Sequence, residues 1–122
     1  MSYTTFEYGK VTADKKTITA DENISFTVSV KNSGKRAGAE VVQLYIRDKK
    51  SALPRPVKEL KGFRKIELQP GESQEVRFTI DRKALQYYDD RKQEWVTEPG
   101  AFEALIGSSS ADIRTRVTFT LK

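Results

Sequence analysis

The chain has 122 residues, a length typical of one domain with its own hydrophobic core. It carries 22 Lys and Arg residues against 17 Asp and Glu residues, so the net charge is +5, but the two signs are interspersed along the chain. This pattern indicates a solvated mixed-charge surface and disfavours nucleic acid as a partner. The sequence contains no cysteine, which excludes a disulfide framework, a thiolate zinc site and a thiol nucleophile. It shows neither an apolar run near ~18 residues nor a signal-peptide pattern, so no membrane partner is expected and no compartment is identified.

Alternating apolar and polar residues predict strands along nearly the whole chain. In chain order the expected strands are a weak one at 6–11, then 24–30, 41–46, 76–80, 102–106 and 117–121. Turn-forming residues separate them, at 32–35, 70–71, 99–100 and 107–110. One segment, 81–85, is expected to form a single helical turn with Asp81 as its N-cap.

The strand expected at 41–46 is denser in apolar residues than the others, so we expect it to be central and buried on both faces. Short strands at regular spacing, with turn signals between them, are typical of an all-β sandwich. The length and the strand count predict an immunoglobulin-like sandwich of about seven or eight antiparallel strands.

A long connection, SALPRPVKELKGFRKIELQPGES (51–73), separates two of these strands. Pro54 and Pro56 cannot donate hydrogen bonds to a sheet, so they should hold Arg55 outward in an extended surface segment. Gly62 within the following apolar run predicts a bulge or bend in an edge strand or a strand that changes sheets. A stiff exposed segment loses less entropy on docking, which favours a partner surface here.

Four blocks of sequence point to a family: SYTTFEY, AGAEVVQLYIRD, PRPVKELKGFRKIELQPGESQEVRFTI and EWVTEPGAFEALIGSSSADIR. Together, in this order and spacing, they resemble the fibronectin type III-like C-terminal domain of glycoside hydrolase family 3 enzymes, the β-glucosidases and their relatives. The resemblance implies a fibronectin type III-like sandwich over residues 1–122, a single domain excised from a larger glycosidase. It also implies that a barrel domain and an α/β sandwich domain precede it in a retaining parent that hydrolyses terminal β-linked sugars.

Catalysis is not expected from this chain alone. The resemblance places the nucleophilic aspartate and the acid/base glutamate of the family outside this domain, so no catalytic residue carries over. An independent pair formed by Asp89 or Asp90 with Glu94 is disfavoured, because the run DDRKQE reads as a polar hairpin tip that does not fix the geometry of two carboxyl groups. Without His or Cys, and without a calcium-loop motif, we expect no metal site and no cofactor.

The candidate domain-interface residues lie in or beside the long connection: Arg55, Val57, Leu60 and Phe63. Arginine and aromatic side chains dominate interface energetics, so these residues are expected to pack on the catalytic domains of the parent or to form an oligomer contact. The alternative is that residues 51–63 are only a long crossover between the sheets.

A second candidate is a sugar contact through Tyr87, Tyr88 and Trp95, since sugars stack on exposed aromatic faces. We favour the alternative that Tyr88 and Trp95 pair across a hairpin and close the bottom of the core, because a lone tryptophan in a small sandwich usually packs inside. A third hypothesis is that the chain is a general protein-interaction domain with an unrelated partner.

Overall fold

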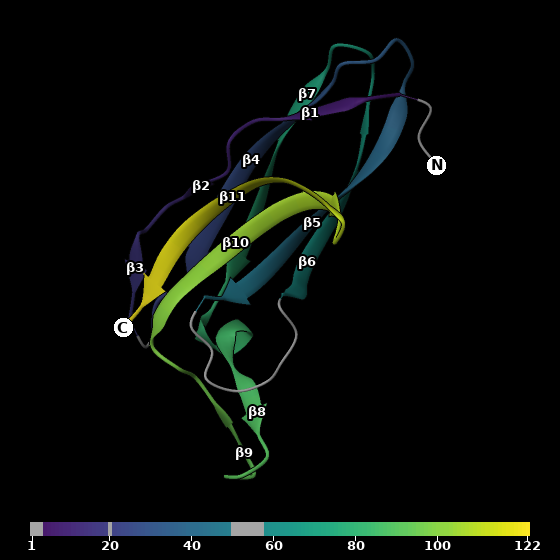
Figure 1. Cartoon of the computed structure of the whole chain (residues 1–122). Helices are drawn as coiled ribbons and strands as arrows, with labels where there is room; N and C mark the ends of the chain where they lie inside the picture. The colour runs from purple at the N-terminus through teal and green to yellow at the C-terminus, as the bar shows by residue number, and fades with distance from the viewer. Residues whose placement is uncertain (1–3, 20, 50–57) are drawn as a thin grey trace.

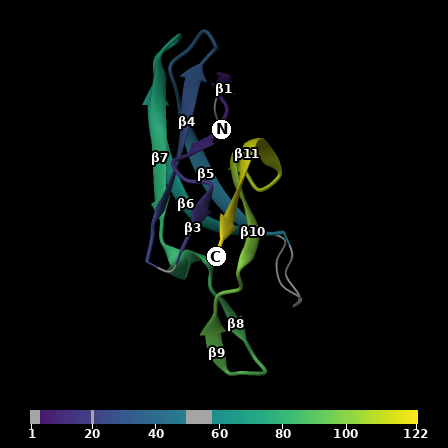
Figure 2. The same ribbon diagram turned by 90° about the vertical axis from the view of Figure 1, so that its left-hand side faces the viewer.

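The computed structural model of this chain describes residues 4–19, 21–49 and 58–122 and shows two packed β-sheets with a small hairpin at one end (Figure 1). In the first sheet, β4 (Ile24–Asn32) lies between β7 (Ser73–Ile80) on one side and the short strands β1 (Phe6–Tyr8) and β2 (Thr12–Ala13) on the other. The second sheet has the order β3 (Thr17–Ile18), β11 (Asp112–Leu121), β10 (Gly100–Ser109), β5 (Gly38–Asp48) and β6 (Glu59–Leu68). Figure 2 shows the two layers from the side, with β7 and β4 in one and β10 and β11 in the other. The predicted all-β sandwich is confirmed.

The N-terminal segment differs from the single weak strand expected at 6–11. It forms three short strands, of which β1 and β2 pair with β4 and β3 pairs with β11, so the chain crosses from one sheet to the other. The crossing is fixed at Asp14, whose main-chain N–H donates to Ser25 O while its Oδ1 accepts from Ser25 N. The β3–β11 pair is parallel, whereas antiparallel pairing was expected throughout.

The core lies between the sheets and is built around three phenylalanines. Phe119 of β11 stacks on Phe102 of β10, with the ring centroids 5.7 Å apart, and meets Phe26 of the opposite sheet at 5.4 Å. All three rings are buried, so the alternation seen in the sequence does place one face of each strand in the core. Aromatic pairs in such tilted or offset arrangements add stability beyond the burial of their area.

The strand β5 is central, between β10 and β6, as predicted. Its burial on both faces is only partly right: Val42, Leu44 and Ile46 lie in the core, whereas on the other face Tyr45 is buried but Val41 is 37% exposed. The reason is that no third layer of described residues covers the outer face of the five-stranded sheet (Figure 2).

The strand β6 forms an edge of its sheet and carries the predicted irregularity at Gly62. Leu44 pairs with Gly62 while the next residue, Tyr45, pairs with Leu60, so one extra residue of β6 is inserted here. A Cβ atom on Gly62 would come 3.1 Å from the ring of Phe78, which explains why the smallest residue stands at the bulge.

The predicted helical turn is a 3-10 turn, η1 (Arg82–Leu85), and Asp81 is its N-cap, accepting from Ala84 N at 3.3 Å. A hairpin of β8 (Tyr87–Asp89) and β9 (Glu94–Val96) follows and extends beyond the end of the sandwich (Figures 1 and 2). The turn expected at 107–110 begins later, because β10 continues to Ser109. Gly107 instead lies at a register shift within β10, where a Cβ atom would meet Asp112 O at 2.0 Å.

Candidate domain interface

The outer face of the five-stranded sheet carries an exposed apolar patch. The bulged register of β6 places Phe63 opposite Gln43 and Leu60 opposite Tyr45, so both apolar side chains share this face. Leu60 is 50% exposed and Phe63 is 62% exposed. Together with Val41 on the neighbouring strand they form what we call the outer-face patch (Val41, Leu60 and Phe63). Large apolar side chains gathered on one face are typical of an interaction surface.

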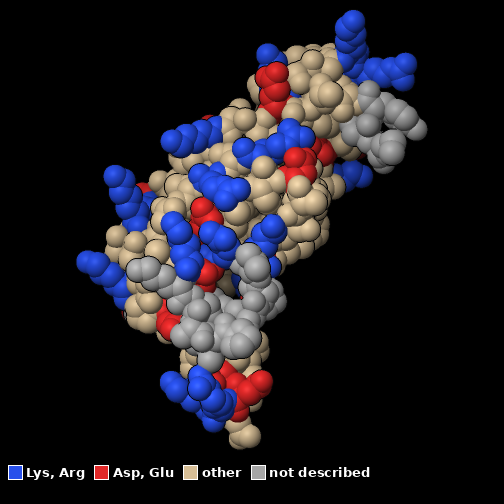
Figure 3. All heavy atoms as spheres, viewed as in Figure 1, with Lys and Arg blue, Asp and Glu red and all other residues tan. Residues whose placement is uncertain are grey.

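An ionic centre lies beside this patch on the same face. Glu103 of β10 is only 7% exposed, and its Oε1 lies 3.0 Å from Arg47 Nη2, while its Oε2 lies 4.0 Å from Arg116 Nη1. The contact with Arg47 lacks hydrogen-bond geometry, so among the described residues neither Glu103 Oε1 nor Arg47 Nε has a hydrogen-bond partner. Lys and Arg side chains gather across the middle of this face, with acidic groups between them (Figure 3). The face is therefore both apolar and arginine-bearing.

Sequence reasoning identified Leu60 and Phe63 but missed Val41, Arg47 and Glu103. The signal that could have found them is the alternation of Val41, Gln43, Tyr45 and Arg47 along β5, which marks one face of a strand. The cross-strand pairing of Arg47 with Glu103 depends on the register of β5 against β10, which the sequence does not give. The other two candidates, Arg55 and Val57, lie outside the described residues.

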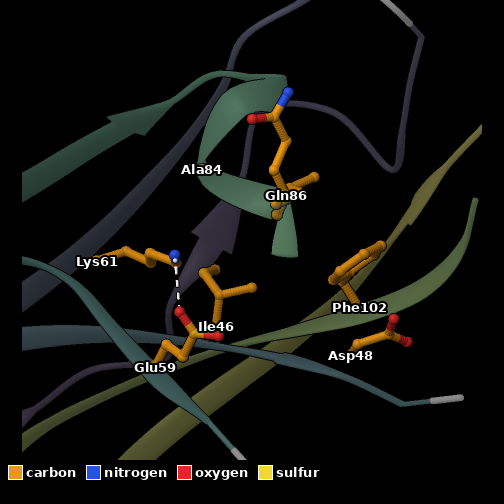
Figure 4. A pocket seen from close by; sticks show the side chains of 8 residues that line it. Ile46, Asp48, Glu59, Lys61, Ala84, Gln86 and Phe102 are labelled. Atoms are coloured by element: carbon orange, nitrogen blue, oxygen red, sulfur yellow. Dashed lines mark hydrogen bonds and ion pairs between the residues drawn. The ribbon is translucent and has the colours of Figure 1, made fainter. Parts of the chain in front are cut away.

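A small hollow lies under η1, between it and the ends of β5, β6 and β10 (Figure 4). Gln86 and Ala84 line one side and Glu59 and Lys61 the other, with Lys61 Nζ 3.1 Å from Glu59 Oε2. Its volume of about 20 Å³ holds one water molecule and excludes a sugar ring. The hollow therefore brings the start of β6 close to the segment that leads into the hairpin.

The hairpin aromatics are arranged differently from our expectation. Tyr88 and Trp95 do pair across the hairpin, edge to face, with centroids 5.6 Å apart and an interplanar angle of 75°. They do not close the core: Tyr88 is 46% exposed and Trp95 is 64% exposed. The expected burial of Trp95 is wrong because β8 and β9 form a separate sheet that leaves the sandwich. The side chain of the third candidate, Tyr87, lies outside the described part of the chain.

The carboxylate of Asp89 stabilises the turn of the hairpin. Asp89 faces Glu94 in the register, as the expected pairing of Tyr88 with Trp95 implies. Asp89 is buried, however, and its Oδ1 accepts a hydrogen bond from Arg91 N at 3.0 Å, whereas Glu94 is exposed. Asp89 thus caps the turn, and its Oδ1 is engaged by a main-chain N–H.

The described residues hold no group of three or more His, Cys, Asp or Glu side chains placed to bind a metal ion. No helix among them is long and apolar enough to cross a membrane.

Comparison with known proteins identifies the family. The pattern of the fibronectin type III-like domain (Fn3-like) matches residues 40–110, which run from β5 to the turn after β10. The chain belongs to the fibronectin type III-like domain family. It is 55% identical to β-glucosidase BoGH3A of Bacteroides ovatus over 98% of its length, and 48% identical to the thermostable β-glucosidase B of Acetivibrio thermocellus over 100%.

Solved structures agree with this assignment. A β-glucosidase of Erythrobacter marinus contains a region that superposes with a TM-score of 0.91 at 38% identity, covering 100% of this chain and 16% of that one. The GH3 β-glucosidase of Bifidobacterium adolescentis gives 0.89 at 37% identity, covering 99% and 18%. The predicted resemblance to this domain of glycoside hydrolase family 3 enzymes is confirmed.

The match covers only a small part of each relative. The chain spans 16% of the Bacteroides enzyme and 17% of the Acetivibrio enzyme. Those relatives are multidomain β-glucosidases, and the Fn3-like domain that this chain represents is itself non-catalytic.

Proposed function

We propose that residues 1–122 form a single accessory domain of a larger, retaining β-glucosidase-like enzyme of glycoside hydrolase family 3. The domain stabilises this parent by packing on its catalytic domains, and the parent hydrolyses terminal β-linked sugars. The sequence similarity to β-glucosidases over almost the whole chain supports this assignment.

The observation that carries the proposal is the outer-face patch. Leu60 and Phe63 project from an edge strand, on the same face of the sheet as the partly exposed side chains of Arg47 and Arg116. Apolar and aromatic anchors with neighbouring arginines have the composition of an interface core. Burying these side chains against a neighbouring domain would remove apolar area from water and stabilise the assembled enzyme.

The test compares the 122-residue chain with the full-length protein that carries it. On a chromogenic aryl β-glucoside, the chain should be inactive and the full-length protein active. In the full-length protein, the double substitution Leu60→Thr and Phe63→Thr should shorten the half-life of activity at elevated temperature, because threonine keeps strand propensity but removes the apolar anchors. Glu75→Thr, an exposed strand position on the other sheet, is the matched control. Turnover by the chain, or a double variant as durable as Glu75→Thr, would contradict the proposal.

Exposure of Trp95 favours a second candidate function, carbohydrate binding by the hairpin. The angle of 75° between the rings of Tyr88 and Trp95 argues against sugar binding, because a stacking platform needs aromatic faces that lie in one plane. Since Trp95 is the single tryptophan of the chain, its fluorescence reports directly on this site. Quenching or a blue shift on adding cello- or laminari-oligosaccharides would support sugar binding.

A further inference from the structure

The hairpin β8–β9 forms a sheet of its own, separate from the two sheets of the sandwich. Its two strands pair only with each other among the described strands, and it extends past the end of the sandwich (Figures 1 and 2). A two-stranded hairpin in water is at best marginally stable without packing against something else. Its shape is nevertheless specified, because the buried Asp89 holds the turn through Arg91 N.

The exposed side chains of this hairpin suit insertion into a pocket. Trp95 leaves 64% of its surface free while Tyr88 supports it edge-on. The two ring planes stand at 75° to each other, so they do not form a flat platform with both faces side by side. Tryptophan is among the residues most enriched at the energetic centre of protein interfaces. Its indole N–H is a donor only, so a matching pocket offers apolar walls and one hydrogen-bond acceptor.

The hairpin lies at the same end of the molecule as part of the outer-face patch. Gln86, which immediately precedes β8, lines the small hollow together with Glu59 and Lys61 (Figure 4). Leu60 stands between those two residues in β6. One neighbouring body can therefore contact the start of β6 and the hairpin at once.

We propose that the β8–β9 hairpin is a second docking element, with Trp95 seated in an apolar pocket of the same catalytic part that covers the outer-face patch. This inference rests on the proposed function. About five-sixths of each relative lies outside the region that this chain matches, and the match includes the hairpin. We therefore take the rest of the same polypeptide as the partner whose pocket receives Trp95.

The test separates docking from a purely local role of Trp95. Trp95→Ala and the milder Trp95→Phe are made in the 122-residue chain and in the full-length protein, with Lys92→Ala at the exposed hairpin tip as the control. In the full-length protein, Trp95→Ala should lower the apparent Tm by about 3 °C or more, and Trp95→Phe by less. In the chain alone, both variants should melt within about 1 °C of the wild type, because Trp95 contributes little to the core.

Four results would overturn the inference. Equal losses of Tm in the chain and the full-length protein would make Trp95 a local support of the hairpin. If the Trp95 variants do not lower the Tm of the full-length protein while the Leu60→Thr and Phe63→Thr double variant still destabilises it, the hairpin is not part of the interface but the proposed function stands. If neither the Trp95 variants nor the double variant destabilises the full-length protein, both the inference and the proposed function are wrong. A saturable response of Trp95 fluorescence to oligosaccharides in the chain would assign the hairpin to sugar binding instead.

Discussion

Asn32, at the end of β4, donates a hydrogen bond from its Nδ2 to the main-chain oxygen of Leu68 in β6, 3.0 Å away, and so joins the two sheets. The amide is fully buried and uses all of its hydrogen-bonding capacity. Its Nδ2 also donates to Arg36 O, and its Oδ1 accepts from Thr4 Oγ1 and Gly34 N. One side chain therefore fixes the turn after β4, the N-terminal segment and the end of the edge strand.

Asn32→Asp should destabilise the chain by about 3 kcal/mol. The substitution keeps the size but replaces a donor by an acceptor that faces two carbonyl oxygens. The measurement is urea unfolding followed by far-UV circular dichroism, since the exposed Trp95 makes fluorescence a weak probe. Asn23→Asp, at an exposed position, is the control and should change stability by less than about 0.5 kcal/mol. Similar losses for the two variants would contradict the role given to Asn32.

Phe119→Ala should lower the free energy of unfolding by about 4 kcal/mol, because it removes a buried ring that touches Phe26 across the sandwich and Phe102 within its own sheet. Phe63→Thr should lower the free energy of unfolding of the isolated chain by less than about 1 kcal/mol, since that ring is mostly exposed. The same unfolding measurement gives both values. A surface substitution as costly as the core substitution would mean that Phe63 supports the domain itself, and it would weaken the proposed docking role.

Stability should fall at high pH through Tyr8. Burial, followed by the nearby Glu40 carboxylate, raises the pKa of Tyr8 well above its ordinary value of 10, and the phenol donates to Glu40 Oε2 at 3.1 Å. Because the folded state holds this proton more tightly than the unfolded state, the contribution is fully present below pH 10 and is lost as the pH rises above it. Unfolding measured from pH 8 to 11 should show a smaller decline for Tyr8→Phe than for the wild type. Parallel curves for the two proteins would contradict the assignment.

Much of the fold could be predicted from the sequence because strand periodicity and turn residues are local signals. The bulge at Gly62 and the cap at Asp81 follow from what single residues can and cannot do. The same reasoning predicted that β6 is either an edge strand or a strand that changes sheets, and it is an edge strand. The division of the N-terminal segment between two sheets could not be predicted, because it depends on a side-chain contact of Asp14 with the main chain of Ser25 in another strand.

The candidate surface was predictable only in part, for the same reason. Exposure of Leu60 and Phe63 follows from an edge strand, but the pairing of Arg47 with Glu103 depends on the register between β5 and β10. Burial of Trp95 was inferred from residue type, and the separate sheet β8–β9 overrides that tendency. Residue type gives an average environment, whereas the topology decides which strands belong to the core.

We propose that another part of the larger enzyme covers the outer-face patch. Hydroxyl-radical footprinting read by mass spectrometry tests this most directly, in the 122-residue chain and in the full-length protein. Phe119, buried in the core, is the internal control and should stay unmodified in both. Phe63 and Leu60 should be oxidised readily in the chain and be protected several-fold in the full-length protein. Equal oxidation of Phe63 in the two proteins would show that this face stays open to solvent, and would contradict the proposed docking.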